Sequence, residues 1–127
     1  MRSFHAYIIP LAVALFATAS PLLGHHQSAI YDRAHLTTVG GRVTQFNFVN
    51  PHTTIHLQVK EKSGEVREWT AEVASPIMLS KVGWDKDTLR LGDNVTIQGF
   101  RAKDGSRLLS ARKLILPNGK VLNQREK

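Results

Sequence analysis

A segment near the middle of the chain alternates polar and apolar side chains with a period of two. In HTTIHLQVK, residues 52–60, one face carries Thr53, Ile55, Leu57 and Val59. The opposite face carries two histidines, a threonine and a glutamine. Side chains of a β-strand point alternately to opposite faces, so this pattern predicts a half-buried strand. The alternation constrains the chain to a mainly β structure.

Turn residues divide the rest of the sequence into further expected strands. Ser63-Gly64 predicts a hairpin between residues 52–60 and a strand at residues 66–73. Gly92-Asp93 precedes a strand that ends near residue 100, and Asp104-Gly105 leads into a strand at residues 106–116. Asn118-Gly119 is typical of a tight two-residue hairpin. These turns predict two strands and a small hairpin in the C-terminal part.

The first expected strand, residues 37–50, is long and changes its pattern partway. Val39 and Val43 share one face in a regular strand, whereas Phe46 and Phe48 share the other. With Gly40-Gly41 nearby, this change predicts a β-bulge or a strand that turns a corner between two sheets.

One short helix is expected between the third and fourth strands, at residues 75–83. Ser75 suits the N-cap, Pro76 suits the first helical position, and Gly83 is a natural stop. Five strands with a helix between strands 3 and 4 is the element order of the OB-fold, a partly open Greek-key barrel. We therefore predict a five-stranded OB-like barrel, with an open β-sandwich as the alternative.

The N-terminus predicts export. An apolar run from Tyr7 to Ala17 has the length of a signal-peptide core, and Ala17 and Ala19 fit an A-x-A cleavage site. We expect a signal peptide at residues 1–19, a lead segment at 20–35, the OB-like domain at 36–122 and a polar tail at 123–127. The mature protein is then periplasmic or secreted, with no transmembrane span after cleavage.

Composition narrows the classes of function. The chain has no cysteine, which excludes disulfides, thiolate metal sites and a cysteine nucleophile. The formal net charge of +7 makes an anionic envelope ligand a candidate partner, and export makes nucleic acid an unlikely one. No nucleophile motif, carboxylate pair or phosphate-binding loop is present, so we expect no enzyme activity.

Six short motifs occur in order along the chain: His25-His26, Asn50-Pro51-His52, Trp69 with Glu72, Gly83-Trp84, Gly92-Asp93 and Gly119. Together they resemble a family of small exported bacterial proteins whose domain has no assigned function. The resemblance covers about residues 25–122. Gln27 and Phe48 depart from it, since the family usually has serine and tryptophan at these positions. The resemblance implies an exported protein but no biochemical activity.

Two candidate sites emerge from these residues. A ligand site at one barrel end is expected to use His52, Glu72 and Trp84, although His52 also fits a structural corner and Trp84 a core position. Trp69 is expected in the core. Four residues of a strand span about 13 Å, so His52 and His56 cannot share one metal ion.

The alternative is a copper or zinc site. It would use His25 and His26, with His35 or His52 as a further ligand, because imidazole binds both ions well. The pair would chelate most strongly if His25 were the first residue of the mature protein, since its free amino group could then bind the same ion.

The cleavage site is testable directly. Because Ala17 and Ala19 provide the small residues that signal peptidase needs, the intact mass of the protein recovered from the periplasm should correspond to a chain that starts at Ser20. A mass starting at His25 would contradict this and favour copper binding. The full-length mass in the membrane fraction would show instead that residues 1–19 act as an uncleaved anchor.

Overall fold

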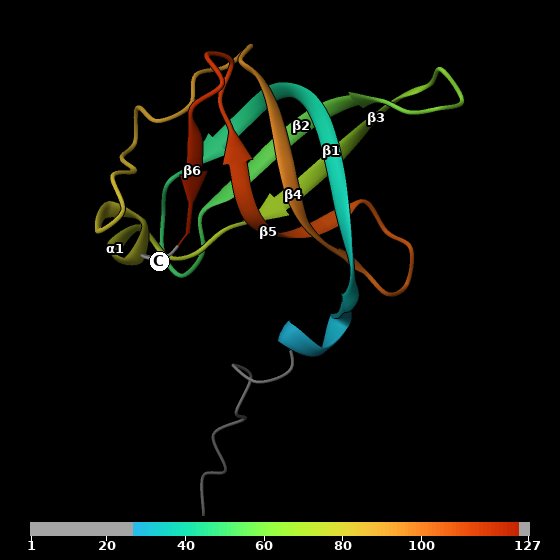
Figure 1. Cartoon of the computed structure of the whole chain (residues 1–127), viewed down its shortest axis with the longest axis horizontal. Helices are drawn as coiled ribbons and strands as arrows, with labels where there is room; N and C mark the ends of the chain where they lie inside the picture. Colours follow the sequence, from blue (N-terminus) through green and yellow to red (C-terminus); the bar gives the residue numbers. More distant parts are fainter. Residues whose placement is uncertain (1–26, 125–127) are drawn as a thin grey trace, which may run out of the picture.

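The computed structural model describes residues 27–124, which form a six-stranded antiparallel sheet that curls into a barrel. A 3-10 helix, η1 (Gln27–Ile30), leads into β1 (Tyr31–Asn47), and the other strands follow it. These are β2 (Thr54–Lys60), β3 (Val66–Glu72), β4 (Asn94–Ala102), β5 (Leu108–Ile115) and β6 (Val121–Asn123), with the helix α1 (Pro76–Ser80) between β3 and β4. Figure 1 shows β1 arching over the top of the barrel.

The strand order identifies the barrel. Neighbouring strands follow the order β3-β2-β1-β4-β5-β6, and a further parallel pairing joins β3 to β5. This pairing links only Thr70, Ala71 and Glu72 to Leu108, Leu109 and Ser110. It closes β1 to β5 into a ring, with α1 between β3 and β4. The predicted five-stranded OB-like barrel is confirmed, and β6 extends it as the small C-terminal hairpin.

The long first strand belongs to both halves of the barrel. Its first part pairs with β4 as far as Arg42, and its second part pairs with β2 from Arg42 onward. The register slips between Val43 and Gln45, three residues after the glycine pair. This bulge adds one residue, so Phe46 turns inward and packs against the same core as Val39 and Val43.

The core lies inside the barrel and follows the alternation of the sequence. The predicted inward face of β2 is confirmed, because Thr53, Ile55, Leu57 and Val59 are all buried. Trp69 is buried on β3, as predicted. The core also includes Val39, Val43, Ala71, Val73, Leu79, Trp84, Leu89, Val95, Ile97, Leu109, Ala111, Leu114 and Leu122. Among residues 27–124, no helix is long and apolar enough to cross a bilayer.

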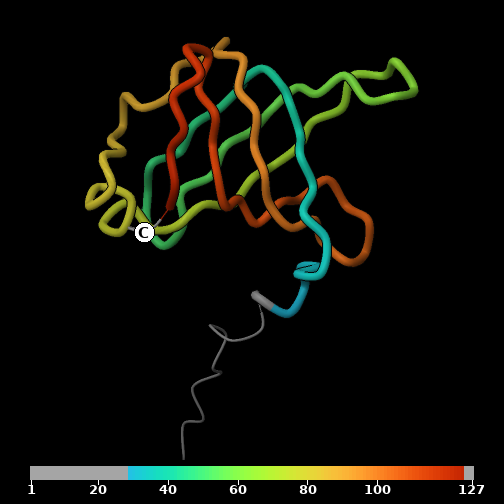
Figure 2. Tube along the Cα trace, viewed as in Figure 1, coloured from blue at the N-terminus to red at the C-terminus, as the bar shows by residue number. Residues whose placement is uncertain are grey.

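The helix begins at Pro76, as expected, and Gly83 ends the segment with a positive φ of 91°. The predicted N-cap residue is confirmed as Ser75, although its side chain makes no hydrogen bond to the helix. The described fold also begins earlier than the expected boundary at residue 36, since β1 starts at Tyr31. At the other end, the end of β6 lies beside residues that flank α1, because the Trp84 indole donates to the Asn123 carbonyl oxygen and Ala74 N–H donates to the Gln124 side chain. Figure 2 follows the chain from β1 in cyan to β6 in red.

A polar clamp reinforces the closure of the barrel. The Glu61 carboxylate, at the end of β2, accepts hydrogen bonds from Arg107 Nε at 2.7 Å and from the Trp69 indole at 3.2 Å. Arg107 lies in the β4–β5 loop, and its backbone oxygen accepts a bond from Thr70 N. The Arg101 guanidinium lies 4.8 Å from the centre of the Trp69 ring. These contacts tie the β2–β3 hairpin to the loop that precedes β5.

Gly41 is the position where β1 can carry no side chain. A Cβ there would lie 2.7 Å from the Gln58 carbonyl oxygen and 2.9 Å from Val59 Cγ2, whereas a Cβ on Gly40 would meet only ordinary contacts. We expect Gly41→Ala to lower the free energy of unfolding by about 1–3 kcal/mol. The matched variant Gly40→Ala should cost nothing. Urea denaturation of both variants tests this, and equal losses would contradict it.

The clamp predicts a pH dependence. The hydrogen bonds from Arg107, followed by that from Trp69, lower the pKa of Glu61 from 4.5 to about 2. The ionised carboxylate therefore stabilises the fold above pH 4.5, and this stabilisation is lost as the pH falls toward 2. Glu61→Gln should be less stable than the wild type at pH 6, and the difference should shrink between pH 4.5 and 2.

Urea denaturation at several pH values measures this difference. Glu65→Gln is the matched control, because Glu65 pairs with Arg67 on its own hairpin and does not reach the β4–β5 loop. A destabilisation by Glu61→Gln that stays constant from pH 6 to 2 would contradict the assignment.

Candidate functional site

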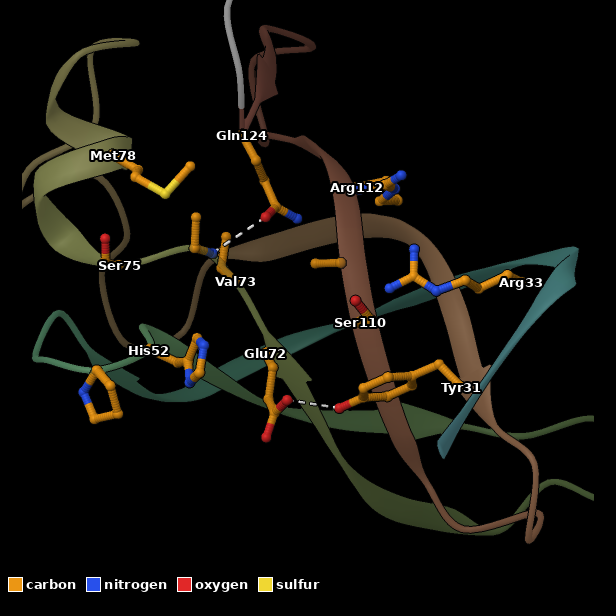
Figure 3. Close-up of a pocket in the computed structure, with 13 residues that line it drawn as sticks. Tyr31, Arg33, His52, Glu72, Val73, Ser75, Met78, Ser110, Arg112 and Gln124 are labelled. Carbon is orange, nitrogen blue, oxygen red and sulfur yellow. Dashed lines mark hydrogen bonds between the residues drawn. The ribbon is translucent and has the colours of Figure 1, made fainter. Parts of the chain in front are cut away.

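A pocket of about 510 Å³ opens on the outside of the barrel where the β3–β5 pairing ends. We call it the seam pocket. Figure 3 shows it between the end of β3, the start of β1, β5 and the helix. Its lining residues are Tyr31, Arg33, Pro51, His52, Glu72, Val73, Ala74, Ser75, Met78, Ser110, Ala111, Arg112 and Gln124.

Tyr31 and Glu72 form the floor of the seam pocket. Tyr31 is only 4% exposed, but it lies outside the core cluster, on the outer side of the barrel. Its hydroxyl donates a hydrogen bond of 2.7 Å to Glu72 Oε2 (Figure 3). Burial and the neighbouring carboxylate raise the pKa of Tyr31 well above its usual value. The phenol thus stays protonated and donates to Glu72.

Glu72 reaches this position because of strand alternation. Trp69 and Ala71 point into the core, whereas Thr70 and Glu72 point outward. Glu72 pairs with Ser110, the last pair before β3 and β5 diverge. The prediction that Glu72 faces away from Trp69 is confirmed, and its carboxylate lines the pocket.

Arg112 enters the pocket at a β-bulge. Gln98 of β4 pairs with Lys113 and the next residue, Gly99, pairs with Ala111, so Arg112 is the extra residue of β5. Ser110 and Arg112 flank the buried Ala111, so both lie on the outer face of β5 and line the pocket. The Arg112 guanidinium also lies 5.4 Å from the centre of the Phe100 ring, which limits its orientations.

Arg33 reaches the pocket from an irregular part of β1. Tyr31 pairs with Ala102, but the next partner on β4, Phe100, pairs with Leu36. Between these two pairs, β1 therefore advances by five residues while β4 advances by only two. The Asp32 side chain holds this stretch, because it accepts the Ala34 N–H and contacts the His35 ring. Arg33 and Tyr31 lie on the same side and line the pocket together.

His52 and Gln124 complete the opposite rim. His52 follows Pro51 in the corner between β1 and β2 and also lines the pocket. The corner position and the ligand-site position expected for His52 are therefore the same place. Gln124 follows β6, and its side-chain oxygen accepts the Ala74 N–H at 3.1 Å. The nitrogen of the same amide is buried and has no hydrogen-bond partner among the described residues.

The structure brings together two of the three predicted ligand residues, His52 and Glu72. It does not bring Trp84 to them: the indole is 3% exposed, donates to the Asn123 carbonyl oxygen and belongs to the core. A tryptophan at the end of a short helix buries a large apolar area, which favours the core position. Met78 of α1 lines the pocket instead.

The structure leaves the metal hypothesis as a prediction. His25 and His26 lie outside the described residues. The side chain of His35 is 82% exposed, pairs with Asp32 and does not line the seam pocket with His52. Within residues 27–124, no three His, Asp or Glu side chains are grouped closely enough to hold a metal ion.

Sequence reasoning missed six polar residues of the pocket: Tyr31, Arg33, Ser75, Ser110, Arg112 and Gln124. Tyr31 and Arg33 fell in the expected lead segment, and Gln124 in the expected tail. Arg112 carried one detectable signal, since the apolar residues Leu109, Ala111 and Leu114 break the period of two around it. No sequence pattern indicated that these segments meet.

Comparison with known proteins supplies a family. No curated protein matches the chain. Among solved structures, the mitochondrial single-stranded DNA binding protein Rim1 from S. cerevisiae matches with a TM-score of 0.49 and 13% identity, over 65% of this chain and 92% of that one. A family of unknown function (DUF6152) matches residues 12–110, most of the chain. The chain belongs to this family.

Proposed function

We propose that this chain is an exported, non-enzymatic binding or accessory module of the bacterial envelope, and that it holds its ligand in the seam pocket. One observation carries the proposal. The pocket gathers charged and polar side chains from β1, the β1–β2 corner, β3, β5 and the end of β6 in one concave surface. Small-molecule sites are concave and contain a few convergent polar groups.

The chemistry of the pocket favours binding over catalysis. A nucleophile–base pair needs a hydrogen bond between the two groups. Ser75 and Ser110 are the two serines that line the pocket. Within the described residues, no hydrogen bond joins either of them to His52. The Glu72 carboxylate already accepts the Tyr31 hydroxyl. These side chains can hold and orient a ligand through hydrogen bonds and charge.

Export is supported by the sequence of residues 1–19, with its apolar run and its A-x-A site. Cleavage after Ala19 would remove one positive charge, Arg2, from the net +7 and leave +6. A protein of this charge attracts the anionic components of an envelope. The periplasm is therefore the compartment in which we place the module and its ligand.

A nucleic-acid partner receives less support. OB-folds bind oligonucleotides on the face of strands 2 and 3, where aromatic side chains stack on bases. Here the outward positions of β2 and β3 hold Thr54, His56, Gln58, Lys60, Val66, Glu68, Thr70 and Glu72. None of these is a phenylalanine, tyrosine or tryptophan, and both tryptophans are buried in the core.

The proposal predicts that a periplasmic small molecule contacts the pocket. Adding a low-molecular-weight periplasmic extract to the ¹⁵N-labelled mature protein should shift the NMR signals of Ser110, Arg112 and the Gln124 side-chain amide, because these residues line the pocket. The turn at Asp104-Gly105, outside the lining, serves as the internal control. Shifts confined to other surfaces, or none at saturating extract, would contradict the proposal.

A further inference from the structure

We infer that the seam pocket binds an oxyanion, a phosphate or carboxylate group of a small ligand, between Arg33, Arg112 and the Gln124 amide. The inference rests on the proposed function and names the ligand class of the same site. Three hydrogen-bond donors from β1, β5 and the segment after β6 line one pocket. Oxyanions offer several acceptor oxygens and are bound most strongly by charged donors.

Arg112 is the bulged residue of β5. Ser110 pairs with Phe100, whereas Arg112 has no partner on β4, because it lies between the pairs Gly99–Ala111 and Gln98–Lys113. Gly99 makes the bulge possible, because a Cβ there would clash with the Ser110 carbonyl oxygen. The contact with the Phe100 ring holds the guanidinium without using its N–H donors. A planar guanidinium held in this way can bind two oxygens of one oxyanion.

Arg33 supplies the second charge. In Figure 3 its guanidinium lies on the same side of the pocket as Arg112, above Ser110 and away from His52. Neither arginine makes an ion pair or side-chain hydrogen bond with another described residue, whereas Arg67 and Arg107 both pair with glutamates. The donors of Arg33 and Arg112 are therefore free to bind a ligand. Two such groups around one pocket favour an anion over a neutral molecule.

Gln124 supplies an independent observation. Its side-chain oxygen is fixed by the Ala74 N–H, so the orientation of the amide is determined and its NH₂ group faces the pocket (Figure 3). This nitrogen is buried without a hydrogen-bond partner among the described residues. A buried donor without a partner is destabilising. A ligand oxygen at this position would satisfy it.

Glu72 limits where the anion can lie. Its carboxylate would repel an oxyanion beside it, but Oε2 accepts the Tyr31 hydroxyl, and Figure 3 places Glu72 on the floor, apart from the Gln124 amide. With two arginines and one glutamate, the charged side chains of the lining sum to +1 when His52 is neutral. The other Glu72 oxygen remains an acceptor for a hydroxyl or ammonium group elsewhere in the ligand.

An NMR titration with inorganic phosphate and with glucuronate tests the inference on the mature protein. Both should shift the Gln124 side-chain amide and the Arg112 backbone signal in a saturable way. Vesicles of phosphatidylglycerol, compared with phosphatidylcholine vesicles, distinguish a lipid phosphate from a free small ligand. If only the phosphatidylglycerol vesicles shift these signals, the oxyanion is a lipid headgroup, and the inferred chemistry still holds.

Three variants probe the donors. Arg33→Gln and Arg112→Gln remove one charge each at exposed positions and should weaken phosphate binding about 10-fold or more. Gln124→Glu keeps the acceptor for the Ala74 N–H and replaces the NH₂ donor by a negative oxygen, so it should abolish phosphate binding. Arg90→Gln is the matched control, since Arg90 is exposed and outside the lining. Thermal melts should show that all four variants remain folded.

Failure of the inference and failure of the proposed function give different results. If periplasmic extract shifts the pocket signals but phosphate, glucuronate and phosphatidylglycerol do not, the ligand is not an oxyanion and the binding function stands. If Arg90→Gln weakens binding as much as Arg33→Gln does, the attraction is nonspecific and the inference is overturned. If nothing shifts the pocket signals, both proposals fail.

Discussion

The pairing of β3 with β5 is the contact on which the rest of this structure depends. It joins only three residues of each strand, yet it turns an open sheet into a closed barrel around one core. The chain has no cysteine, so no disulfide adds to the stability that this core provides. The Glu61–Arg107–Trp69 clamp lies at one end of this short parallel pairing and strengthens it. At the other end, beyond Glu72 and Ser110, the strands separate and the seam pocket begins.

Irregularities of the strands build the pocket. The bulge at Arg112 and the register slip after Tyr31 both interrupt pairing with β4, and an arginine that lines the pocket with Glu72 lies at each of them. A regular strand would keep its backbone groups paired and its side chains in strict alternation. The glycines of the barrel permit the close approaches that this geometry needs, notably at Gly41 and Gly99. The barrel is therefore least regular where its polar side chains converge.

The same arrangement explains why the two tryptophans give no information on the ligand. Both indoles are buried, and both N–H groups are satisfied within the protein, by Glu61 for Trp69 and by the Asn123 carbonyl for Trp84. Both tryptophans belong to the core of the barrel. We propose instead that charged hydrogen-bond donors bind the ligand. In the sequence, these arginines look the same as ordinary surface residues.

The sequence by itself determined the class of fold. The alternation in residues 52–60, the turn glycines and the helix between strands 3 and 4 predicted an OB-like barrel, because these signals are local. They also placed His52 at a corner and Glu72 on the outer face. Only the tertiary structure decided that Tyr31, Arg33, Arg112 and Gln124 join them, and that Trp84 does not. Bulges depend on packing across the whole barrel, and so does the meeting of residues 41 positions apart, as for Tyr31 and Glu72, or 50 positions apart, as for Ala74 and Gln124. No local pattern encodes either.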